Sequence, residues 1–307
     1  MEIVVSGTVL ILGASGRFGR HAAEAFWNRS WQVKTFDRET EDLGTAAAGV
    51  DVIVNAWNPP YTAWECEVPR LTERVIAAAK SSGAAVILPG NVYVFGHDAP
   101  PLLSETTPHA ASNSLGRVRI EMEAAYRASG VRTIVLRAGD YIDTEASGNW
   151  FDAVIAAKCS RGTFVAPGDM DADHAWAWLP DLAHAAVLLA ERLRTLDTFE
   201  DLSFPGFNLS MSALHRICEQ ATGRDLEVRR FPWFAIRVAG LFWPMGRSLV
   251  EMRYLWSKPH RLDGTRLQTL LPELRTTDPL TAITAALNTP VEPDKSVART
   301  EAHIAAE

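Results

Sequence analysis

Three glycines near the start of the chain, Gly13, Gly16 and Gly19, follow a short apolar run at a spacing that suits phosphate binding. A glycine has no Cβ, so the chain can turn tightly and its backbone can approach a phosphate closely. The apolar residues 9–12 predict a buried strand, and an amphipathic helix is expected after the turn. Free N–H groups at the start of that helix would hold the pyrophosphate of a dinucleotide. The predicted contacts are Gly13, Ser15, Gly16, Arg17, Phe18 and Gly19.

A carboxylate follows the second predicted strand, residues 32–36, at the offset where an acidic side chain can bind the adenosine ribose. This residue, Asp37, favours NAD because it would repel the 2′-phosphate of NADP. Arg38 and Arg17 are cations that could pair with that phosphate or stack on adenine, so NADP stays open. NAD is the cofactor that the sequence favours.

The overall composition excludes several classes of function. The 307 residues carry a net charge of −7, and no run of Lys and Arg indicates a nucleic-acid partner. The apolar residues 231–250 are interrupted by Arg237, Pro244 and Arg247, so they are too short and too charged to span a bilayer. We therefore expect a small-molecule substrate, no nucleic acid and no membrane partner.

The cysteines fit neither a disulfide framework nor a metal site. Cys66, Cys159 and Cys218 lie far apart in the sequence, and no cluster of His, Cys and Asp has the spacing of metal ligands. They are interpreted as buried thiols of a cytoplasmic protein, with no metal bound.

Strand and helix signals alternate through the first two hundred residues. This order predicts an α/β fold, a Rossmann-type doubly wound parallel sheet, whose ligands bind beyond the carboxyl ends of the strands. A small C-terminal α/β substrate lobe is expected to follow. The predicted strands are 9–12, 32–36, 51–55, 84–88 and 133–137, and the predicted helices are 17–29, 65–81 and 114–129. The expected domains are 1–165 plus 179–203 for the dinucleotide, 166–178 plus 204–290 for the substrate lobe, and 291–307 as a tail.

These motifs in this order resemble the short-chain dehydrogenase/reductase superfamily, in its extended or atypical branch of NAD-dependent epimerases and dehydratases. The resemblance covers residues 8–290 and rests on 13–19, Asp37, 51–56, 92–96, 135–139 and 179–183. It implies that Asn55 and Ala56, followed by Trp57, lie along the cofactor. It also implies a homodimer formed through the helices at 65–81 and 114–129.

The resemblance breaks at the catalytic positions. The family uses a serine or threonine with a Tyr and a Lys four residues apart; the lysine lowers the pKa of the tyrosine, which then exchanges a proton with the substrate. Here Asn91, Leu115 and Arg119 stand in the places of the serine, the tyrosine and the lysine. Leu115 cannot transfer a proton, whereas Arg119 can still bind ribose hydroxyls and Asn91 can orient a substrate.

Another proton carrier is therefore required if the chain is an enzyme. Tyr93, after the fourth predicted strand, and His174, an imidazole suited to acid–base work near neutral pH, are the leading candidates. Asp140 and Tyr141 follow the fifth strand and are further candidates. The expected function is an NAD(P)-dependent oxidoreductase or epimerase/dehydratase-like enzyme on a small organic or sugar-type substrate. The alternative is a catalytically inactive dinucleotide-binding sensor.

Overall fold

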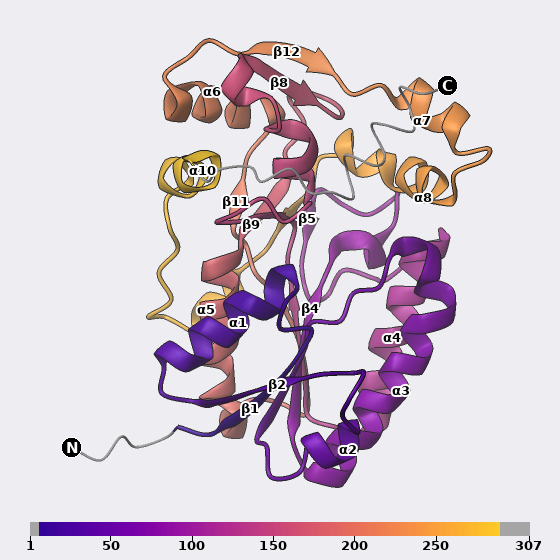
Figure 1. Cartoon of the computed structure of the whole chain (residues 1–307), viewed down its shortest axis with the longest axis vertical. Helices are drawn as coiled ribbons and strands as arrows, with labels where there is room; N and C mark the ends of the chain where they lie inside the picture. Colours follow the sequence, from indigo (N-terminus) through magenta and orange to yellow (C-terminus); the bar gives the residue numbers. More distant parts are fainter. Residues whose placement is uncertain (1–5, 289–307) are drawn as a thin grey trace.

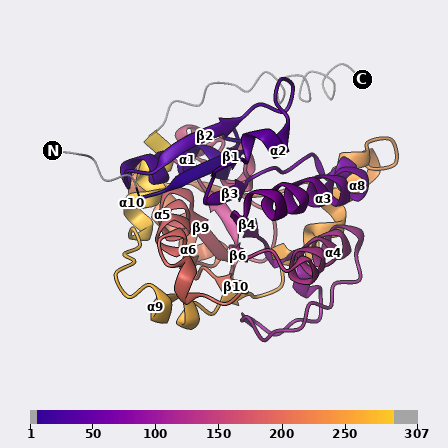
Figure 2. The same cartoon turned by 90° about the horizontal axis from the view of Figure 1, so that it is seen from below.

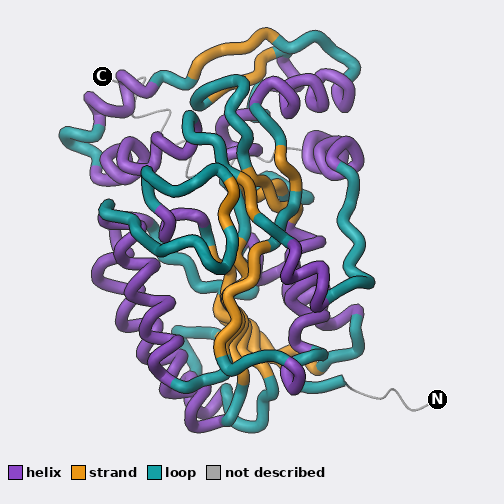
Figure 3. Tube along the Cα trace, turned by 180° about the vertical axis from the view of Figure 1, so that it is seen from behind, coloured by secondary structure: helices purple, strands orange, loops and turns teal. Residues whose placement is uncertain are grey.

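A sheet of parallel strands lies at the centre of the molecule, with helices on either side (Figures 1 and 3). The computed structural model describes residues 6–288. Within this range the central sheet has six parallel strands in the order β10-β6-β4-β3-β1-β2. The five strands expected from the sequence are all present, which confirms the doubly wound fold. The strands are β1 (Thr8–Leu12), β2 (Gln32–Phe36), β3 (Val52–Asn55), β4 (Ala85–Gly90), β6 (Thr133–Arg137) and β10 (Phe199–Ser203).

The direction of strand addition reverses at β1, which pairs with β2 on one side and with β3 on the other. Only the single turn α2 (Leu43–Ala46) lies between β2 and β3. The carboxyl ends of β1 and β3 thus lie side by side at a topological switch point, where open α/β sheets bind their ligands. The glycine turn follows β1 directly at this point.

Helices cover both faces of the sheet (Figures 1 and 2). One face packs against α1 (Arg17–Asn28) and α5 (Leu179–Ala190), and the other against α3 (Trp64–Ser82) and α4 (Ser114–Ser129). The buried strands supply aliphatic side chains to both layers, as expected of a parallel sheet. No helix within residues 6–288 is long and apolar enough to cross a membrane.

A second core lies above the carboxyl edge of the sheet, and its boundary is earlier than the sequence indicated. Strand β7 (Asp140–Ile142) pairs with β9 (Ala175–Trp178), and β8 (Thr163–Ala166) pairs with β12 (Glu227–Arg230). These pairings draw residues 140–166 into the lobe, although the sequence analysis placed them in the Rossmann domain. The lobe also contains β11 (Phe207–Asn208), α6 (Met211–Thr222), α7 (Trp233–Ala239), α8 (Pro244–Met252) and α10 (Pro279–Asn288).

The remaining elements are short. They are β5 (Leu102–Leu103), β13 (Arg261–Leu262), α9 (Thr265–Leu270) and the short helical turns η1 (Tyr61–Ala63), η2 (Val92–Phe95), η3 (Phe151–Ile155), η4 (Cys159–Arg161), η5 (Leu193–Thr195) and η6 (Arg253–Trp256). The predicted tail, 291–307, lies outside the described residues.

A buried arginine joins the ends of three neighbouring strands to α4. Arg137, the last residue of β6, is 1% exposed. Its guanidinium donates to both carboxylate oxygens of Asp201 in β10, at 2.6 and 3.1 Å, and to Glu123 in α4 at 2.8 and 3.2 Å. Its Nη1 also donates to the carbonyl oxygen of Asn91, just after β4, at 2.6 Å. One cation therefore fixes the positions of α4 and of the turn after β4.

We expect Arg137→Leu to lower the free energy of unfolding by about 3–5 kcal/mol, because it leaves two buried carboxylates without their cation. Urea unfolding followed by circular dichroism measures this loss. Arg117→Leu, which removes an exposed arginine on the same helix as Glu123, is the control and should change stability by less than about 0.5 kcal/mol. Equal losses in the two variants would contradict the assigned role of Arg137.

Candidate functional site

The turn between β1 and α1 forms a backbone cradle with exposed hydrogen-bond donors. Gly13 has a φ of +79°, a conformation that favours glycine, and the N–H of Gly16 donates to its carbonyl oxygen at 2.9 Å. A Cβ added at Gly19 would lie 2.0 Å from that oxygen, so α1 can approach the turn only with glycine there. No side chain caps the start of α1. The cradle fits the pyrophosphate of a dinucleotide.

The other residues of the turn have different environments. Ser15 is exposed on the turn, whereas Phe18 is 4% exposed and packs into the core between α1 and the sheet. Arg17 donates to the carbonyl oxygens of Ser147 and Gly148, at 2.8 and 2.5 Å. The structure therefore binds Arg17 to the loop after β7, and Phe18 belongs to the hydrophobic core.

A buried carboxylate holds that same loop against α1. Asp143 accepts hydrogen bonds from Ser147 Oγ and Arg20 Nη2, at 2.6 and 2.5 Å, and lies 2.8 Å from His21 Nε2. Burial alone would raise the pKa of Asp143, but the hydrogen bonds from His21, Ser147 and Arg20 lower it to about 2. The loop is thus fixed beside the glycine turn by an ionised side chain.

Asp37 lies at the carboxyl end of β2, as the sequence predicted. Its oxygens accept from the backbone N–H of Glu39 and the hydroxyl of Thr40, both at 2.9 Å, and these bonds lower its pKa. The carboxylate is exposed and anionic, with lone pairs left for ribose hydroxyls. The neighbouring Arg38 is also exposed.

The segment after β3 lies against the glycine turn. Asn55 is buried and donates to the hydroxyl of Tyr126 at 3.0 Å, and the N–H of Ala56 donates to the carbonyl oxygen of Leu12 at 3.0 Å. A Cβ added at Gly13 would approach the Ala56 carbonyl oxygen to 3.2 Å and the Trp57 ring to 3.3 Å. The predicted cofactor residues Asn55, Ala56 and Trp57 are therefore brought next to the turn.

Aromatic side chains and one arginine gather beyond the same edge of the sheet. The hydroxyls of Tyr61 and Tyr93 are 2.7 Å apart, and Arg119 lies over the ring of Trp64, at 4.4 Å from its centre. Arg119 donates to Asn58 Oδ1 at 3.1 Å, but its Nε is buried without a hydrogen-bond partner. An unpartnered buried N–H of a cation is costly, and this Nε shares that state with the side-chain atoms Trp31 Nε1, Asn113 Oδ1, Ser203 Oγ and Tyr254 Oη.

Burial dominates the electrostatics of this cluster. It raises the pKa of Tyr93 well above its usual range, and the neighbouring Tyr61 and Asp140 raise that pKa further. Burial also raises the pKa of Tyr141 to about 12 and lowers that of Arg119. The tyrosines are therefore neutral near pH 7 and can act as proton donors, not as bases.

Tyr61 was not among the residues expected from the sequence. It lies in η1, more than thirty positions before Tyr93, and no motif connects the two. The one indication in the sequence was the group of aromatic residues in the segment after β3, Trp57, Tyr61 and Trp64.

Asn91 and Leu115, which the sequence analysis set in the places of the serine and the tyrosine, have structural roles here. Asn91 Oδ1 accepts from the N–H of Tyr93 at 3.0 Å and caps η2, so its oxygen is already bound. Leu115 is 3% exposed in the core, and its N–H donates to Glu251 of α8 at 2.9 Å. The C-terminal lobe thus packs directly over the start of α4.

His174 is not placed to touch a substrate, because it is 2% exposed. Its Nε2 lies 2.7 Å from Asp140 Oδ2, and its ring stacks on Trp256 with the centres 4.5 Å apart. The side chain of Asp140 is 25% exposed. His174 therefore orients Asp140, which shares its surroundings with the tyrosine cluster.

The cysteines differ from the sequence interpretation in one respect. Cys159 and Cys218 are buried free thiols, as expected, but Cys66 is exposed on α3. It lies in the first turn of that helix, on the side facing away from the sheet.

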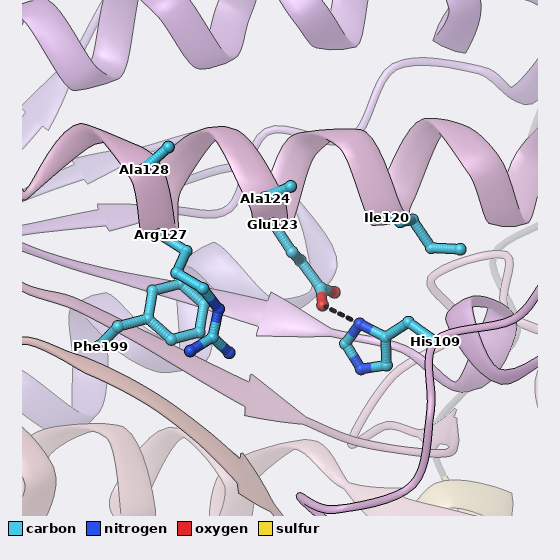
Figure 4. A pocket seen from close by; sticks show the side chains of 7 residues that line it. All are labelled: His109, Ile120, Glu123, Ala124, Arg127, Ala128 and Phe199. Atoms are coloured by element: carbon cyan, nitrogen blue, oxygen red, sulfur yellow. Dashed lines mark ion pairs between the residues drawn. The ribbon is translucent and has the colours of Figure 1, made fainter.

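A second polar cluster lies beside β10, the outermost strand on the side of the sheet away from β2, next to a cavity of about 250 Å³ (Figure 4). His109 Nδ1 is 3.6 Å from Glu123 and its Nε2 is 3.5 Å from Asp201. This is the set of described residues that could hold a metal ion. Arg137 already binds both carboxylates, so a divalent cation would meet a positive charge at this site.

Solved structures share this fold. No protein-family model matches the sequence, and neither does any curated protein. UDP-glucose-4-epimerase from Stenotrophomonas maltophila, with NAD and formylated UDP-arabinopyranose bound, is 16% identical, with a TM-score of 0.67 over 96% of this chain and 99% of that one. UDP-glucuronic acid 4-epimerase from Bacillus cereus, in complex with NAD, is 15% identical, with a TM-score of 0.68 over 91% and 94%. The UDP-Glc/GlcNAc 4-epimerase from Campylobacter jejuni is 15% identical, with a TM-score of 0.66 over 92% and 98%. The fold expected from the resemblance is thereby confirmed.

The buried histidine beside His174 predicts a loss of stability in acid. Burial lowers the pKa of His260 from 6.5 to about 3, and His174 lowers it further. Between these pH values the unfolded chain binds a proton that the folded chain excludes, so the free energy of unfolding should fall as the pH decreases. Urea unfolding at a series of pH values measures this slope, and His260→Gln should flatten it between pH 6.5 and about 3. An unchanged slope in the variant would contradict this assignment.

Proposed function

We propose that this chain is an NAD(P)-dependent oxidoreductase or epimerase/dehydratase-like enzyme on a small organic or sugar-type substrate. The observation that carries the proposal is the cluster in which Arg119 lies over Trp64, next to the hydrogen-bonded pair Tyr61 and Tyr93. A guanidinium and two neutral hydroxyls suit a polar ligand that bears hydroxyl or carbonyl oxygens.

The cofactor is proposed to be NAD, bound along the carboxyl edge of β1, β2 and β3. The glycine turn would hold the pyrophosphate, Asp37 the adenosine ribose, and Asn55 and Ala56 the path between the two riboses. Arg119 would bind the nicotinamide ribose hydroxyls in place of the family's lysine. When bound, NAD supplies an acceptor and donor of hydride.

The proton of the reaction is assigned to Tyr93, supported by Tyr61. Tyr93 is neutral because its pKa is raised by burial, so it can donate a proton to a substrate carbonyl oxygen while Tyr61 donates to it in turn. To remove a proton from a substrate hydroxyl, the pair Tyr61 and Tyr93 would have to be ionised, and burial opposes that ionisation because it raises the pKa of both. Asp140, oriented by His174, is the carboxylate available to accept that proton.

The substrate class is proposed by analogy with the solved structures. These proteins act on UDP-sugars according to their descriptions, and a nucleotide sugar contains the secondary hydroxyls that the cluster is suited to bind. A homodimer through α3 and α4 and a cytoplasmic location remain predictions.

A catalytically inactive dinucleotide-binding sensor is the second candidate. Leu115 is buried in the core at the place of the catalytic tyrosine, and the Asn91 oxygen is bound to the backbone of η2. Glu251 closes the start of α4 with a further bond. These contacts remove the usual proton pathway and leave the cofactor cradle intact.

Gly19→Ala should weaken NAD binding by about tenfold or more, equivalent to ~1.4 kcal/mol, because its Cβ would push α1 away from the turn. Isothermal titration calorimetry measures the affinity, and circular dichroism checks that the variant folds. Gly240→Ala, whose Cβ has no contact closer than 3.3 Å, is the control. NAD binding of normal affinity by a folded Gly19→Ala protein would argue against the cradle.

Tyr93→Phe should lower turnover by about 10²–10⁴-fold while NAD affinity stays unchanged. Tyr61→Phe should lower turnover by a smaller factor, because Tyr61 acts through Tyr93. Product formation from UDP-glucose, followed by NMR, gives the rates. Because Tyr93 donates its proton as a neutral phenol, the wild-type rate should not rise as the pH is taken moderately above neutral. If the wild type binds NAD and converts none of a panel of UDP-sugars, alcohols and aldehydes, the sensor is the better description.

A further inference from the structure

The helices α7 and α8 present an apolar surface to solvent. Phe242, Phe234 and Leu241 are 92%, 74% and 73% exposed, and Val238 is 48% exposed. These four residues, which lie on α7 and on the turn before α8, are called the α7–α8 surface. Figures 1 and 2 show this turn projecting from one side of the molecule. Large apolar side chains gathered on a projection mark an interaction site.

The surface belongs to a firmly anchored element. Phe234 and Val238 are four residues apart and share one face of α7, and Leu241 and Phe242 follow in the turn before α8. On the other face Trp233 is 8% exposed, packs against Phe231 and donates to the carbonyl oxygen of Pro167 at 2.5 Å. The apolar side chains are therefore held outward by a helix whose inner face is already in contact with the core of the lobe.

Arginines surround the apolar side chains. Residues 228–253 contain five arginines and one glutamate, although the whole chain has a net charge of −7. Arg230, Arg237 and Arg247 are exposed, and none forms an ion pair with any residue in the range 6–288. Arg237 and Arg247 also line a hollow of about 400 Å³ between α7 and α8, which Glu251 borders. The glutamate accepts from the N–H of Leu115 and keeps its negative charge, but the arginines outnumber it, so the net charge around the surface is positive.

This combination favours an anionic partner over a second copy of the chain. Two such surfaces packed face to face would bring like-charged arginines together, which costs free energy. A lipid bilayer with anionic headgroups offers both an apolar interior for exposed aromatic and aliphatic side chains and phosphates for arginines.

We propose that the α7–α8 surface binds the interface of an anionic lipid bilayer. Leu241 and Phe242 enter the boundary between headgroups and acyl chains, and Arg237 and Arg247 contact the phosphates. The composition indicated no membrane partner, and this inference revises that expectation for the membrane surface only. It is independent of the proposed enzymatic function.

Vesicle flotation tests the proposal. The full-length protein should float with phosphatidylcholine vesicles that contain phosphatidylserine, about tenfold more strongly than with phosphatidylcholine alone, and added salt should weaken binding. Leu241→Ser with Phe242→Ser, and separately Arg237→Glu with Arg247→Glu, should each abolish flotation. The matched controls are Trp27→Ser, at an apolar residue 71% exposed on α1, and Arg70→Glu, at an exposed residue of α3; both should float like the wild type.

Two results would overturn the proposal. One is a wild-type protein that stays in solution with both kinds of vesicle, or paired variants that float as the wild type does. The other is a dimer, measured by light scattering without lipid, that Leu241→Ser with Phe242→Ser dissociates, because the surface would then be a contact between copies. Circular dichroism of each variant excludes loss of folding as the cause.

Discussion

The bonds of Arg137 to Glu123 and Asp201 determine where the chemically important segments of this protein lie. The arginine ends β6, the two carboxylates come from α4 and β10, and a third bond reaches the backbone after β4. The turn after β4 carries Tyr93, and Glu123 is one turn along α4 from Arg119. A buried cation held by two carboxylates is stable only in a narrow geometry, because each unpaired charge is costly in the interior. The relative placement of Tyr93 and Arg119 follows from that geometry.

The two halves of the candidate site have different physical origins. The glycine turn is built from backbone, and its shape depends on the absence of Cβ atoms at Gly13 and Gly19. The tyrosine and arginine cluster is built from side chains that belong to η1, η2 and α4, separated widely in the chain. The C-terminal lobe is joined to this half, since Glu251 and Met252 of α8 contact the start of α4. Changes in the lobe can therefore alter the cluster without disturbing the cradle.

The sequence was reliable where the signal is local. The apolar strands, the helices between them and the glycine turn were all predicted, because burial on both faces and the need for glycine act within a few residues. Strand β10 was missed, since its five residues include Glu200 and Asp201 and resemble a loop. These acids are accommodated in a strand only because Arg266 and Arg137 bind them.

By itself, the sequence determined the glycine turn at the end of β1, which predicts a dinucleotide, and a leucine, Leu115, at the place where the resemblance predicts a tyrosine. Both are properties of residue type at a fixed place in a motif, so no partner from a distant segment was needed to recognise them. Only the tertiary structure decided that Tyr61 joins Tyr93, that His174 lies behind Asp140, and that Arg119 retains a free donor. These are pairings between side chains from separate elements, and packing and burial, which no local pattern encodes, select them.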